Sequence, residues 1–524
     1  MPNELHLNFQ KPLISTHGAE EEEIRAFHCL QNSFASQYQQ IFHDKMAPRC
    51  VVIIPSLTLD REILKRVKGH FYYEERMLCL LMLLQMPRTH ITFVSSVPID
   101  PVIVDYYLHL LPGITGYHAR QRLTLLSCFD GSPKSLTEKV LERPRLIERI
   151  RSSIPAGHPA HIAFFNITAH ERSLAVQLGL PLYGTDPDLN YLGSKSGSRT
   201  IFKSCGITMP DGFEHVKNEA EVIHCLTLLK QRNPVLKRAV IKLDEGFSGE
   251  GNAVFSYADA PEDAHLEAWI AAHLPLRLAI VATRLHYDTF FEKLESMEGI
   301  VEAFVEGNEK ASPSIQCRIN PLGQIDVLST HDQVLDGENG QIFLGATFPA
   351  NHEYAGELGA IGLKVGEELK RHGALGRFGV DLVSVKEADG WKHYAIEINL
   401  RKGGTTHPYL MLQFLTDGIY DTATGTYRMH DSKERFYFAT DNLQRDCYKG
   451  LTPHDLIDIA MCNELHYNGA TEEGVVFHLI SALSQYGKLG LVSIASSPER
   501  ARAFYNKVVD ILNVECTPQV GYKP

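Results

Sequence analysis

The sequence contains no hydrophobic run long enough to cross a lipid bilayer. Its longest apolar stretch covers residues 77–86 and ends before Pro87, whereas a membrane-spanning helix needs about 20 apolar residues. The first ten residues, MPNELHLNFQ, have no basic segment followed by an apolar one, so we expect no secretory signal. These absences predict a cytoplasmic protein that makes no membrane contact.

Paired cysteines and an excess of positive charge are also missing. The ten cysteines are scattered and none forms a Cys-x-x-Cys pair, which favours free thiols in a reducing compartment. With 51 Lys and Arg against 63 Asp and Glu, the net charge is −12. This balance argues against a nucleic-acid partner. Hydrophobic residues make up 44% of the chain, which is typical of a globular protein with a large core.

Two common nucleotide-binding motifs are absent as well. No Gly-x-Gly-x-x-Gly follows a predicted strand, so a dinucleotide site in the first part of the chain is not expected. No Gly-x-x-x-x-Gly-Lys-Ser/Thr occurs either, which excludes a Walker A loop. A nucleotide site, if there is one, must be built in another way.

Up to about residue 190, apolar runs alternate with helical patterns. Strands are predicted over residues 49–57, 90–97, 122–129 and 161–167, and helices over 72–85, 102–111, 136–152 and 169–178, with a break near Pro144. Strands that are apolar on both faces and alternate with helices predict a parallel sheet covered on both sides. This part therefore reads as an α/β domain.

After residue 190 the pattern is that of antiparallel strands joined by turns, with a helix over residues 357–371. In the tail, helices are predicted near residues 454–461 and 475–484, a strand over 490–494 and a helix over 499–512. The whole chain is thus predicted to be α/β followed by α+β. The pattern changes after residue 191, and the tail covers about residues 450–524.

A Gly-rich segment, EGFSGEG, follows a predicted strand that ends near Lys242. Gly246, Gly249 and Gly251 allow the backbone to approach a ligand closely and to turn N–H groups toward it, and Ser248 lies in the same segment. Lys242 would add a point charge suited to phosphate oxygens. The alternative is a plain Gly-rich hairpin with a solvated lysine.

Asp381 lies on one predicted strand, and Glu397 and Asn399 lie on the next. Glu397 and Asn399 are two residues apart, so they share a strand face. Two carboxylates and an amide oxygen are hard ligands suited to Mg²⁺. The alternative is a half-exposed hairpin with polar residues facing outward.

Whether Asp381 joins that face depends on the turn between the two strands. A two-residue loop at 389–390 would pair Asp381 with Ile398 and point it away from Glu397. A three-residue loop at 388–390, with a left-handed Gly390, would pair Asp381 with Glu397.

Arg401, which follows this hairpin, and a segment further upstream suggest two more roles. Arg401 shares the parity of Glu397 and Asn399, and a fixed cation there can hold a transferring phosphoryl group or an oxyanion. Compensation of the two carboxylates is the alternative. The segment VEAFVEGNE, residues 301–309, has backbone groups able to read an adenine edge, but taken alone it fits an ordinary edge strand better.

In this order the signals resemble the ATP-grasp superfamily of carboxylate–amine ligases, and within it the pheganomycin-type peptide ligases. The resemblance is carried by EINLRKGGTTHP, by PLYGTDPDLNYLGSKSGSRTIFKSCGITMPDG and by the tail GVVFHLISALSQYGKLGLVSIASSPERA, and it covers about residues 160–515. It implies a pre-ATP-grasp α/β domain at residues 1–190, a nucleotide-binding lobe at 191–310, a metal-binding lobe at 311–445 and a small C-terminal domain at 446–524.

The resemblance also implies the roles of individual residues. ATP would be bound by Lys195, Lys242, the loop residues Gly246, Ser248, Gly249 and Gly251, the adenine hinge with Glu302, Phe304 and Val305, and the ribose-binding Glu309. Asp381, Glu397 and Asn399 would bind Mg²⁺, with Mn²⁺ as an alternative. The catalytic residue would be Arg401, while Arg318 and Lys402 would hold a substrate carboxylate.

The implied activity is a two-step ligation, in which ATP converts a carboxylate to an acyl phosphate and an amine then displaces phosphate. His331 and His407 are candidates for the base that deprotonates the amine. The substrates would be small molecules or a peptide, and a homodimer is left open. Two other functions also stay open: a nucleotide-binding regulatory or scaffold protein without ligation, and an enzyme that stops at the acyl phosphate.

Overall fold

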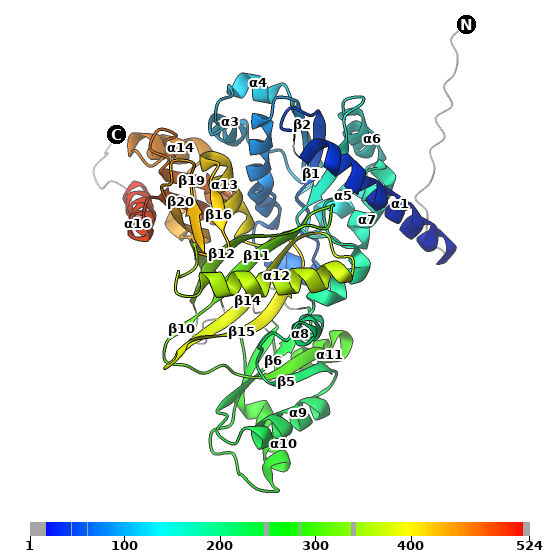
Figure 1. Cartoon of the computed structure of the whole chain (residues 1–524), viewed down its shortest axis with the longest axis vertical. Helices are drawn as coiled ribbons and strands as arrows, with labels where there is room; N and C mark the ends of the chain where they lie inside the picture. The colour runs from blue at the N-terminus through cyan, green and yellow to red at the C-terminus, as the bar shows by residue number, and fades with distance from the viewer. Residues whose placement is uncertain are drawn as a thin grey trace.

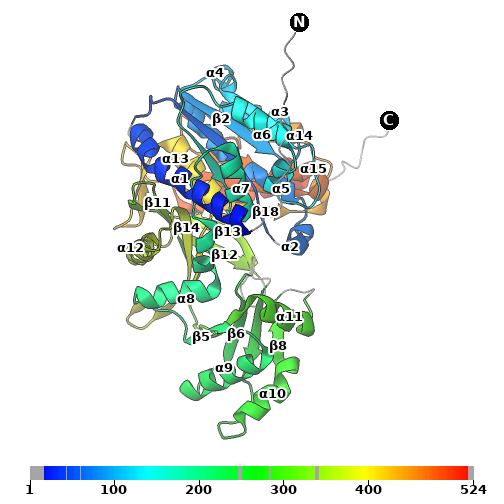
Figure 2. The same cartoon turned by 90° about the vertical axis from the view of Figure 1, so that its right-hand side faces the viewer.

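Four β-sheets organise the chain, and a computed structural model shows their arrangement (Figures 1 and 2). The structure describes residues 17–42, 44–59, 61–245, 251–281, 285–336 and 342–516. Within these ranges, no helix has both the length and the apolar character needed to cross a membrane. Each of the ten cysteines lies in the described ranges and carries a free thiol, as the sequence predicted.

The N-terminal part is a four-stranded parallel sheet with the order β3-β2-β1-β4. This confirms the α/β prediction, and the predicted break at Pro144 separates α5 from α6. The elements are α1 (His17–Phe42), β1 (Arg49–Ile54), α2 (Arg61–Arg66), the 3-10 helix η1 (His70–Gln85), β2 (Thr89–Ser95), α3 (Pro101–His109), α4 (Gly116–Arg120), β3 (Leu123–Ser127), α5 (Leu136–Leu141), α6 (Pro144–Ser152), β4 (Ala160–Phe164), α7 (Ala169–Leu178) and η2 (Pro187–Gly193).

A small lobe follows, drawn in green in Figure 1, with a five-stranded sheet of order β5-β9-β6-β7-β8. Its apolar core is separate from that of the large sheet. The elements are α8 (Lys195–Ser204), β5 (Gly212–Val216), α9 (Glu219–Arg232), β6 (Arg238–Leu243), β7 (Asn252–Ser256), α10 (Leu266–Arg277), β8 (Leu278–Ile280), α11 (Tyr287–Met297) and β9 (Gly299–Ala303).

The rest of the chain builds a nine-stranded sheet of order β10-β14-β11-β12-β13-β18-β20-β19, with β15 paired to β14. A separate two-stranded sheet joins β16 to β17. The elements are β10 (Lys310–Ala311), β11 (Pro313–Ile319), β12 (Ile325–Asp336), β13 (Ile342–Phe348), α12 (Ala355–Arg371), β14 (Gly376–Glu387), β15 (Gly390–Asn399), α13 (Thr406–Thr416), β16 (Ile419–Asp421), β17 (Thr426–Arg428), β18 (Phe436–Gln444), η3 (Asp446–Tyr448), α14 (Pro453–Cys462), β19 (Gly474–His478), α15 (Ala482–Tyr486), β20 (Lys488–Ala495) and α16 (Pro498–Glu515).

One predicted helix of the tail is wrong. Val475, Val476 and Phe477 belong to strand β19, and only residues 482–484 of the expected helix are helical, at the start of α15. All three side chains are buried, and a short run that is apolar on both faces fits a buried strand as well as a buried helix. As a consequence, the tail continues the large sheet across residue 445 through β18, β20 and β19.

Helix η1 buries charged side chains against the N-terminal sheet. Glu74 accepts hydrogen bonds from the backbone N–H and the hydroxyl of Ser96, at 2.7 and 2.5 Å. The Nζ atom of Lys139 donates to the same hydroxyl at 2.9 Å. Burial raises the pKa of the Glu74 carboxyl from 4.5 to about 7. Between pH 4.5 and about 7, the folded protein therefore retains a proton at Glu74 that the unfolded chain has released.

This raised pKa predicts a pH-dependent loss of stability. Between pH 4.5 and about 7 the folded state binds more protons at Glu74 than the unfolded state, so the free energy of unfolding falls as the pH rises through that window. We expect Glu74→Gln to reduce this fall by up to about 3 kcal/mol. Chemical denaturation at pH 5, 6, 7 and 8 measures it. The exposed Glu148→Gln serves as control, and curves of Glu74→Gln and wild type that run parallel would contradict the prediction.

Candidate active site

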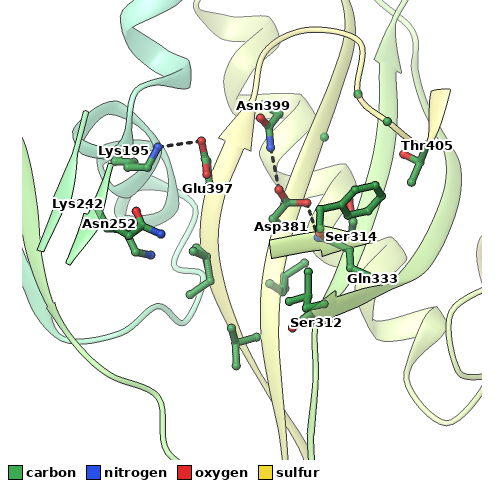
Figure 3. Close-up of a pocket in the computed structure, with 18 of the residues that line it drawn as sticks. Lys195, Lys242, Asn252, Ser312, Ser314, Gln333, Asp381, Glu397, Asn399 and Thr405 are labelled. Carbon is green, nitrogen blue, oxygen red and sulfur yellow. Dashed lines mark hydrogen bonds and ion pairs between the residues drawn. The ribbon is translucent and has the colours of Figure 1, made fainter. Parts of the chain in front are cut away.

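A cavity of about 760 Å³ opens between the small lobe and the large sheet. Its wall contains residues from β6, β9, β14 and β15, and also from η1, β18 and β20. Many of the residues singled out in the sequence lie in this wall: Lys195, Lys242, Glu302, Phe304, Val305, Asp381, Glu397, Asn399 and Arg401. Figure 3 shows how several of them face one another.

Asp381 and Glu397 are direct cross-strand partners of β14 and β15. Paired residues of antiparallel strands project to the same face, so both carboxylates point into the cavity. Asn399 lies two residues further along β15 and faces the same way, with its amide nitrogen 2.8 Å from Asp381 Oδ2. The predicted convergence of these three side chains is thus present in the structure.

The cause of this pairing differs from the predicted three-residue loop. The turn has two residues, with Glu387 opposite Gly390, and on its own it would place Ile396 opposite Asp381. A β-bulge between Asp381 and Leu382 absorbs the extra residue, so that Glu397 becomes the partner of Asp381. The bulge, and not the turn, brings the two acids to one face.

The two carboxylates are electrostatically unlike each other. Burial and, to a lesser degree, the negative charge of Glu397 raise the pKa of Asp381 to about 6. Gln333 donates to Asp381 Oδ1 at 3.0 Å. The Nζ atom of Lys195 lies 3.1 Å from Glu397 Oε1 and compensates that acid directly.

These donors fit a hard divalent cation. A pair of carboxylates in a partly buried wall is unfavourable without positive charge between them, and Asp381 bears this cost in its raised pKa. Asn399 uses its nitrogen on Asp381, which leaves its oxygen for a cation. Oxygen ligands of this kind are the ones that Mg²⁺ prefers.

Lys195 is placed by the first turn of helix α8. Ser194 caps this helix by accepting from the backbone N–H of Gly197 at 3.0 Å. Gly197 sits against the backbone of Tyr191 so tightly that a Cβ atom there would lie 1.9 Å from its carbonyl oxygen. The close approach fixes the position of the helix and of Lys195, whose side chain is buried.

On the opposite wall, Lys242 forms an ion pair of 2.6 Å with Glu302 Oε1, and Arg199 lies 3.0 Å from Glu302 Oε2. Residues 302–305 leave strand β9 along the cavity. The ring of Phe304 lies under the guanidinium of Arg238, at 3.8 Å from its centroid. This wall therefore combines an apolar, aromatic segment with the cation of Lys242.

The Gly-rich segment is only partly described. Gly246, Ser248 and Gly249 lie outside the described residues. The carbonyl of Gly251 accepts from the backbone N–H of Leu243 at 2.9 Å and so closes the base of the β6–β7 hairpin. Gly251 lies next to the Lys242–Asn252 pair, and both residues of that pair line the cavity.

Three predicted residues have partners elsewhere. The exposed Glu309 lies 3.6 Å from Lys386, while the cavity is lined by its neighbours from Lys310 onward. Arg318 lies 2.6 Å from its cross-strand partner Asp326. The pairing of Arg318 was predictable, because both residues flank the turn at 320–323.

Lys402 also has a structural role in place of the predicted contact with substrate. Its backbone N–H donates to Phe165 O at 3.2 Å, and its Nζ atom donates to Phe164 O. Burial lowers the pKa of this amine to about 7. Lys402 therefore anchors the segment after β15 to the end of β4.

The two histidines considered as bases are buried structural groups. His331 lies 2.5 Å from the hydroxyl of Tyr437, and His407 Nδ1 lies 2.9 Å from the carbonyl of Arg76. Burial lowers the pKa of both imidazoles, to about 3 for His331 and about 4 for His407. Neither is among the residues that line the large cavity.

Sequence reasoning missed one end of the cavity. Tyr73, Arg76, Asp441 and Lys488 line it, although they come from η1, β18 and β20. No local pattern marked them, since the contact between Arg76 and Asp441 joins residues 365 positions apart.

Two family models and two curated proteins are similar to this chain in sequence. A family model described as IQCH-like, ATP-grasp matches residues 187–271 and 263–423, and a model of the PGM1 C-terminal domain matches residues 455–508. L-propargylglycine–L-glutamate ligase of Streptantibioticus cattleyicolor is 29% identical over 462 residues, which cover 86% of this chain and 92% of that protein. IQ motif-containing protein H of Danio rerio is 22% identical over 94% of this chain, which spans about half (51%) of that longer protein.

Solved structures share the fold at low identity. The biotin carboxylase domain of Hydrogenobacter thermophilus 2-oxoglutarate carboxylase, in complex with MgADP, ADP and bicarbonate, superimposes with a TM-score of 0.53 at 11% identity, over 88% of this chain and 89% of that one. The ADP complex of N5-carboxyaminoimidazole ribonucleotide synthetase gives 0.51 at 13% identity, over 90% and 99%. Over residues 187–423 the chain is therefore similar to ATP-grasp proteins.

The packing of Gly197 against Tyr191 predicts a link between helix α8 and nucleotide binding. A methyl group at Gly197 must push the helix off the backbone of Tyr191, and overpacking of this kind costs about 1–3 kcal/mol. We expect Gly197→Ala to lower the melting temperature and to weaken binding of a non-hydrolysable ATP analogue, measured by calorimetry. Gly116→Ala in α4, whose Cβ would meet its nearest neighbour at 3.6 Å, is the matched control. Unchanged affinity in Gly197→Ala would refute the link.

Proposed function

We propose that this protein is an ATP- and Mg²⁺-dependent ligase that activates the carboxylate of an amino acid as an acyl phosphate and joins it to the amine of a second amino acid. The observation that carries the proposal is the convergence of Asp381, Glu397 and Arg401 in one cavity with Lys195 and Lys242. The match to the ATP-grasp family model and the similarity to a ligase of two amino acids support the same activity.

In the proposed complex, adenine lies along residues 303–305 and the triphosphate extends toward the two lysines. Lys242 is held at 2.6 Å from Glu302 and Lys195 at 3.1 Å from Glu397, so both ammonium groups are positioned before ATP binds. Positioned cations reduce the reorganisation that phosphoryl transfer requires. Asp381, Glu397 and Asn399 would hold Mg²⁺, which neutralises charge on the phosphates when bound.

The first step forms one bond and breaks another. An oxygen of the substrate carboxylate attacks the γ-phosphorus, the bond from that phosphorus to the β,γ-bridging oxygen breaks, and ADP leaves with the electron pair. Arg401 lines the same cavity as the two acids, and its guanidinium is suited to bind the oxygens of the acyl phosphate. Its Nη1 atom donates to the carbonyl of Lys402 at 3.0 Å, which orients it.

In the second step, the neutral amine attacks the acyl carbon, and the tetrahedral intermediate expels inorganic phosphate. Developing negative charge on the carbonyl oxygen is stabilised by a donor that is already in place, and Arg401 lines the same cavity as the paired acids. The proton lost by the amine passes to the departing phosphate or to solvent in this proposal. His331 and His407 take no part in it, because they are buried elsewhere.

Formation of an amide separates the proposal from its alternatives. Incubation with ATP, L-glutamate and L-propargylglycine, followed by pools of other amino acids, should give an amide detectable by mass spectrometry and amine-dependent release of ADP. A regulatory protein would bind ATP without either product. An enzyme that stops at the acyl phosphate would release ADP without needing an amine.

Glu397→Gln tests the metal-binding role. The substitution keeps the shape but removes the charge that faces Asp381 and Lys195, so we expect release of ADP to fall on the order of 100-fold or more, with the melting temperature preserved. Glu387→Gln, on the exposed end of the same hairpin, controls for effects on the strand pair. Full activity of Glu397→Gln would remove the metal assignment.

Arg401→Ala tests the role of the guanidinium in the chemical step. Because Arg401 is proposed to contact groups that exist only during reaction, we expect kcat to fall on the order of 100-fold while the KM for ATP changes only a few-fold. Steady-state kinetics with ATP varied at saturating amino acids distinguishes the two parameters. A loss confined to ATP affinity would make Arg401 a nucleotide-binding residue.

A further inference from the structure

One end of the cavity has no part in the proposed handling of ATP. Its wall is built by Tyr73 and Arg76 of helix η1, by Phe165 after β4, and by residues of β18 and β20. These segments belong to the N-terminal domain and to the C-terminal tail, which meet here on the edge of the nucleotide site. A ligand bound at this end of the cavity would therefore contact both the N-terminal domain and the C-terminal tail.

Arg76 is a buried cation with few partners. Its guanidinium lies between two aromatic rings, 4.6 Å from the centroids of both Tyr73 and Phe165, and the residue is 8% exposed. The polar contact of the guanidinium within the described structure is a long one, 3.4 Å from Nη1 to Asp441 Oδ2, and Nε is buried without a hydrogen-bond partner there. A guanidinium has five N–H donors, and a buried charge with unused donors is costly.

The packing restricts what can satisfy Arg76. The rings of Tyr73 and Phe165 each contact the guanidinium, and a ligand that completes its hydrogen bonds has to approach the edge that carries the N–H groups. That edge is a planar fork, and it matches the two oxygens of a carboxylate. His407 Nδ1 holds the backbone carbonyl of Arg76 at 2.9 Å, which fixes the residue from behind.

Two further cations face the same end. The Nζ atom of Lys488 lies 2.6 Å from the hydroxyl of Tyr73. Arg401 also lines the cavity. Several cations that line one end of a cavity favour an anionic ligand.

A single carboxylate, that of Asp441, lies among these cations. It is presented by a bulge in β18, where Thr440 pairs with Leu491 but Leu443 pairs with Leu489, so that residues 441–442 have no direct partner on β20. Both of these residues line the cavity. A site in which Asp441 lies beside Arg76 and Lys488 does not suit a simple anion such as phosphate, which Asp441 would repel. It suits a ligand that carries both charges.

We propose that Arg76 and Lys488 bind the α-carboxylate, and Asp441 the α-ammonium group, of an amino-acid substrate whose α-carboxylate is not consumed in the reaction. The assignment of this ligand as a substrate rests on the proposed ligase function, whereas its binding does not. The C-terminal tail thus completes the amino-acid site, and its strand β20 supplies one of the recognising charges.

Pairs of amino acids and their decarboxylated analogues test this proposal. L-glutamate is compared with 4-aminobutyrate, and L-propargylglycine with but-3-yn-1-amine, by calorimetry with a non-hydrolysable ATP analogue and by ADP release with ATP. In the wild type we expect one amino acid to be preferred over its analogue on the order of 100-fold, because the analogue leaves buried cations unpaired. We expect Arg76→Met and Lys488→Met to reduce that preference to a few-fold, with the KM for ATP unchanged.

Controls and outcomes are matched to this design. Arg120→Met and Lys449→Met remove exposed cations and should keep the wild-type preference. Arg76→Lys should restore part of the preference if charge matters, and Lys488→Met keeps the test valid if Arg76→Met does not fold. Equal preference in wild type, Arg76→Met and Lys488→Met, or no preference in the wild type for either pair, would overturn the proposal.

The two proposals fail in different ways. If an amide forms but the preference does not depend on Arg76 or Lys488, the amino-acid site is wrong and the ligase function stands. If the preference in binding depends on these residues but neither ADP nor amide is released, the site stands and the ligase function fails.

Discussion

Two negative charges held opposite each other, on Asp381 and Glu397, set the conditions for the rest of the active site. Neighbouring carboxylates in a partly buried wall repel, and the raised pKa of Asp381 records that repulsion together with burial. Different side chains offset the repulsion at each acid. Lys195 compensates the charge of Glu397, while Gln333 and Asn399 donate hydrogen bonds to Asp381. The positive charge of Arg401 also lowers the pKa of Asp381, although burial and Glu397 keep it raised on balance. Two carboxylates and an amide oxygen held in this way are suited to a divalent cation.

Two β-bulges aim the polar side chains into the cavity. The bulge at the β14–β15 pair changes the register by one residue, which moves Glu397 to the face of Asp381. The bulge in β18 releases Asp441 from its ladder with β20. Because side chains alternate along a strand, a change of one residue in register is enough to reverse the face of everything that follows. Irregular strand pairs, and not loops, therefore position the acids of both halves of the cavity.

Predictions from the sequence succeeded where a periodic pattern or a nearby partner decided the outcome. The parallel sheet followed from apolar strands alternating with helices, and the meander followed from the turn at residues 320–323. The facing of Asp381 and Glu397 was anticipated for a different reason, since a bulge leaves no mark in the alternation of residues. The partners of Arg318 and Lys402 were not foreseen, because charge type alone does not reveal a partner, which for Lys402 is a backbone carbonyl of β4.

The amino-acid end of the cavity lay beyond such reasoning. Arg76 belongs to a buried apolar helix, and its neighbour Asp441 is far away in the chain and sits in an irregular strand. Only the packed structure shows that the tail joins the large sheet and reaches η1, where Glu75 accepts from the backbone N–H of Ser481 at 3.3 Å.

Helix α8 connects the two lobes through its first turns. Ser196 donates to Asp244 at the end of β6 in the small lobe, at 2.9 Å from both its backbone N–H and its hydroxyl. The hydroxyl of Ser198 accepts from the backbone N–H of Ile398 in β15 of the large sheet, also at 2.9 Å. Lys195 itself reaches Glu397 between them. A rotation of the small lobe about this helix would therefore move Lys242 relative to Glu397, while Lys195 stays beside the acid. The helix thus keeps Lys195 beside Glu397 and lets Lys242 move with the small lobe.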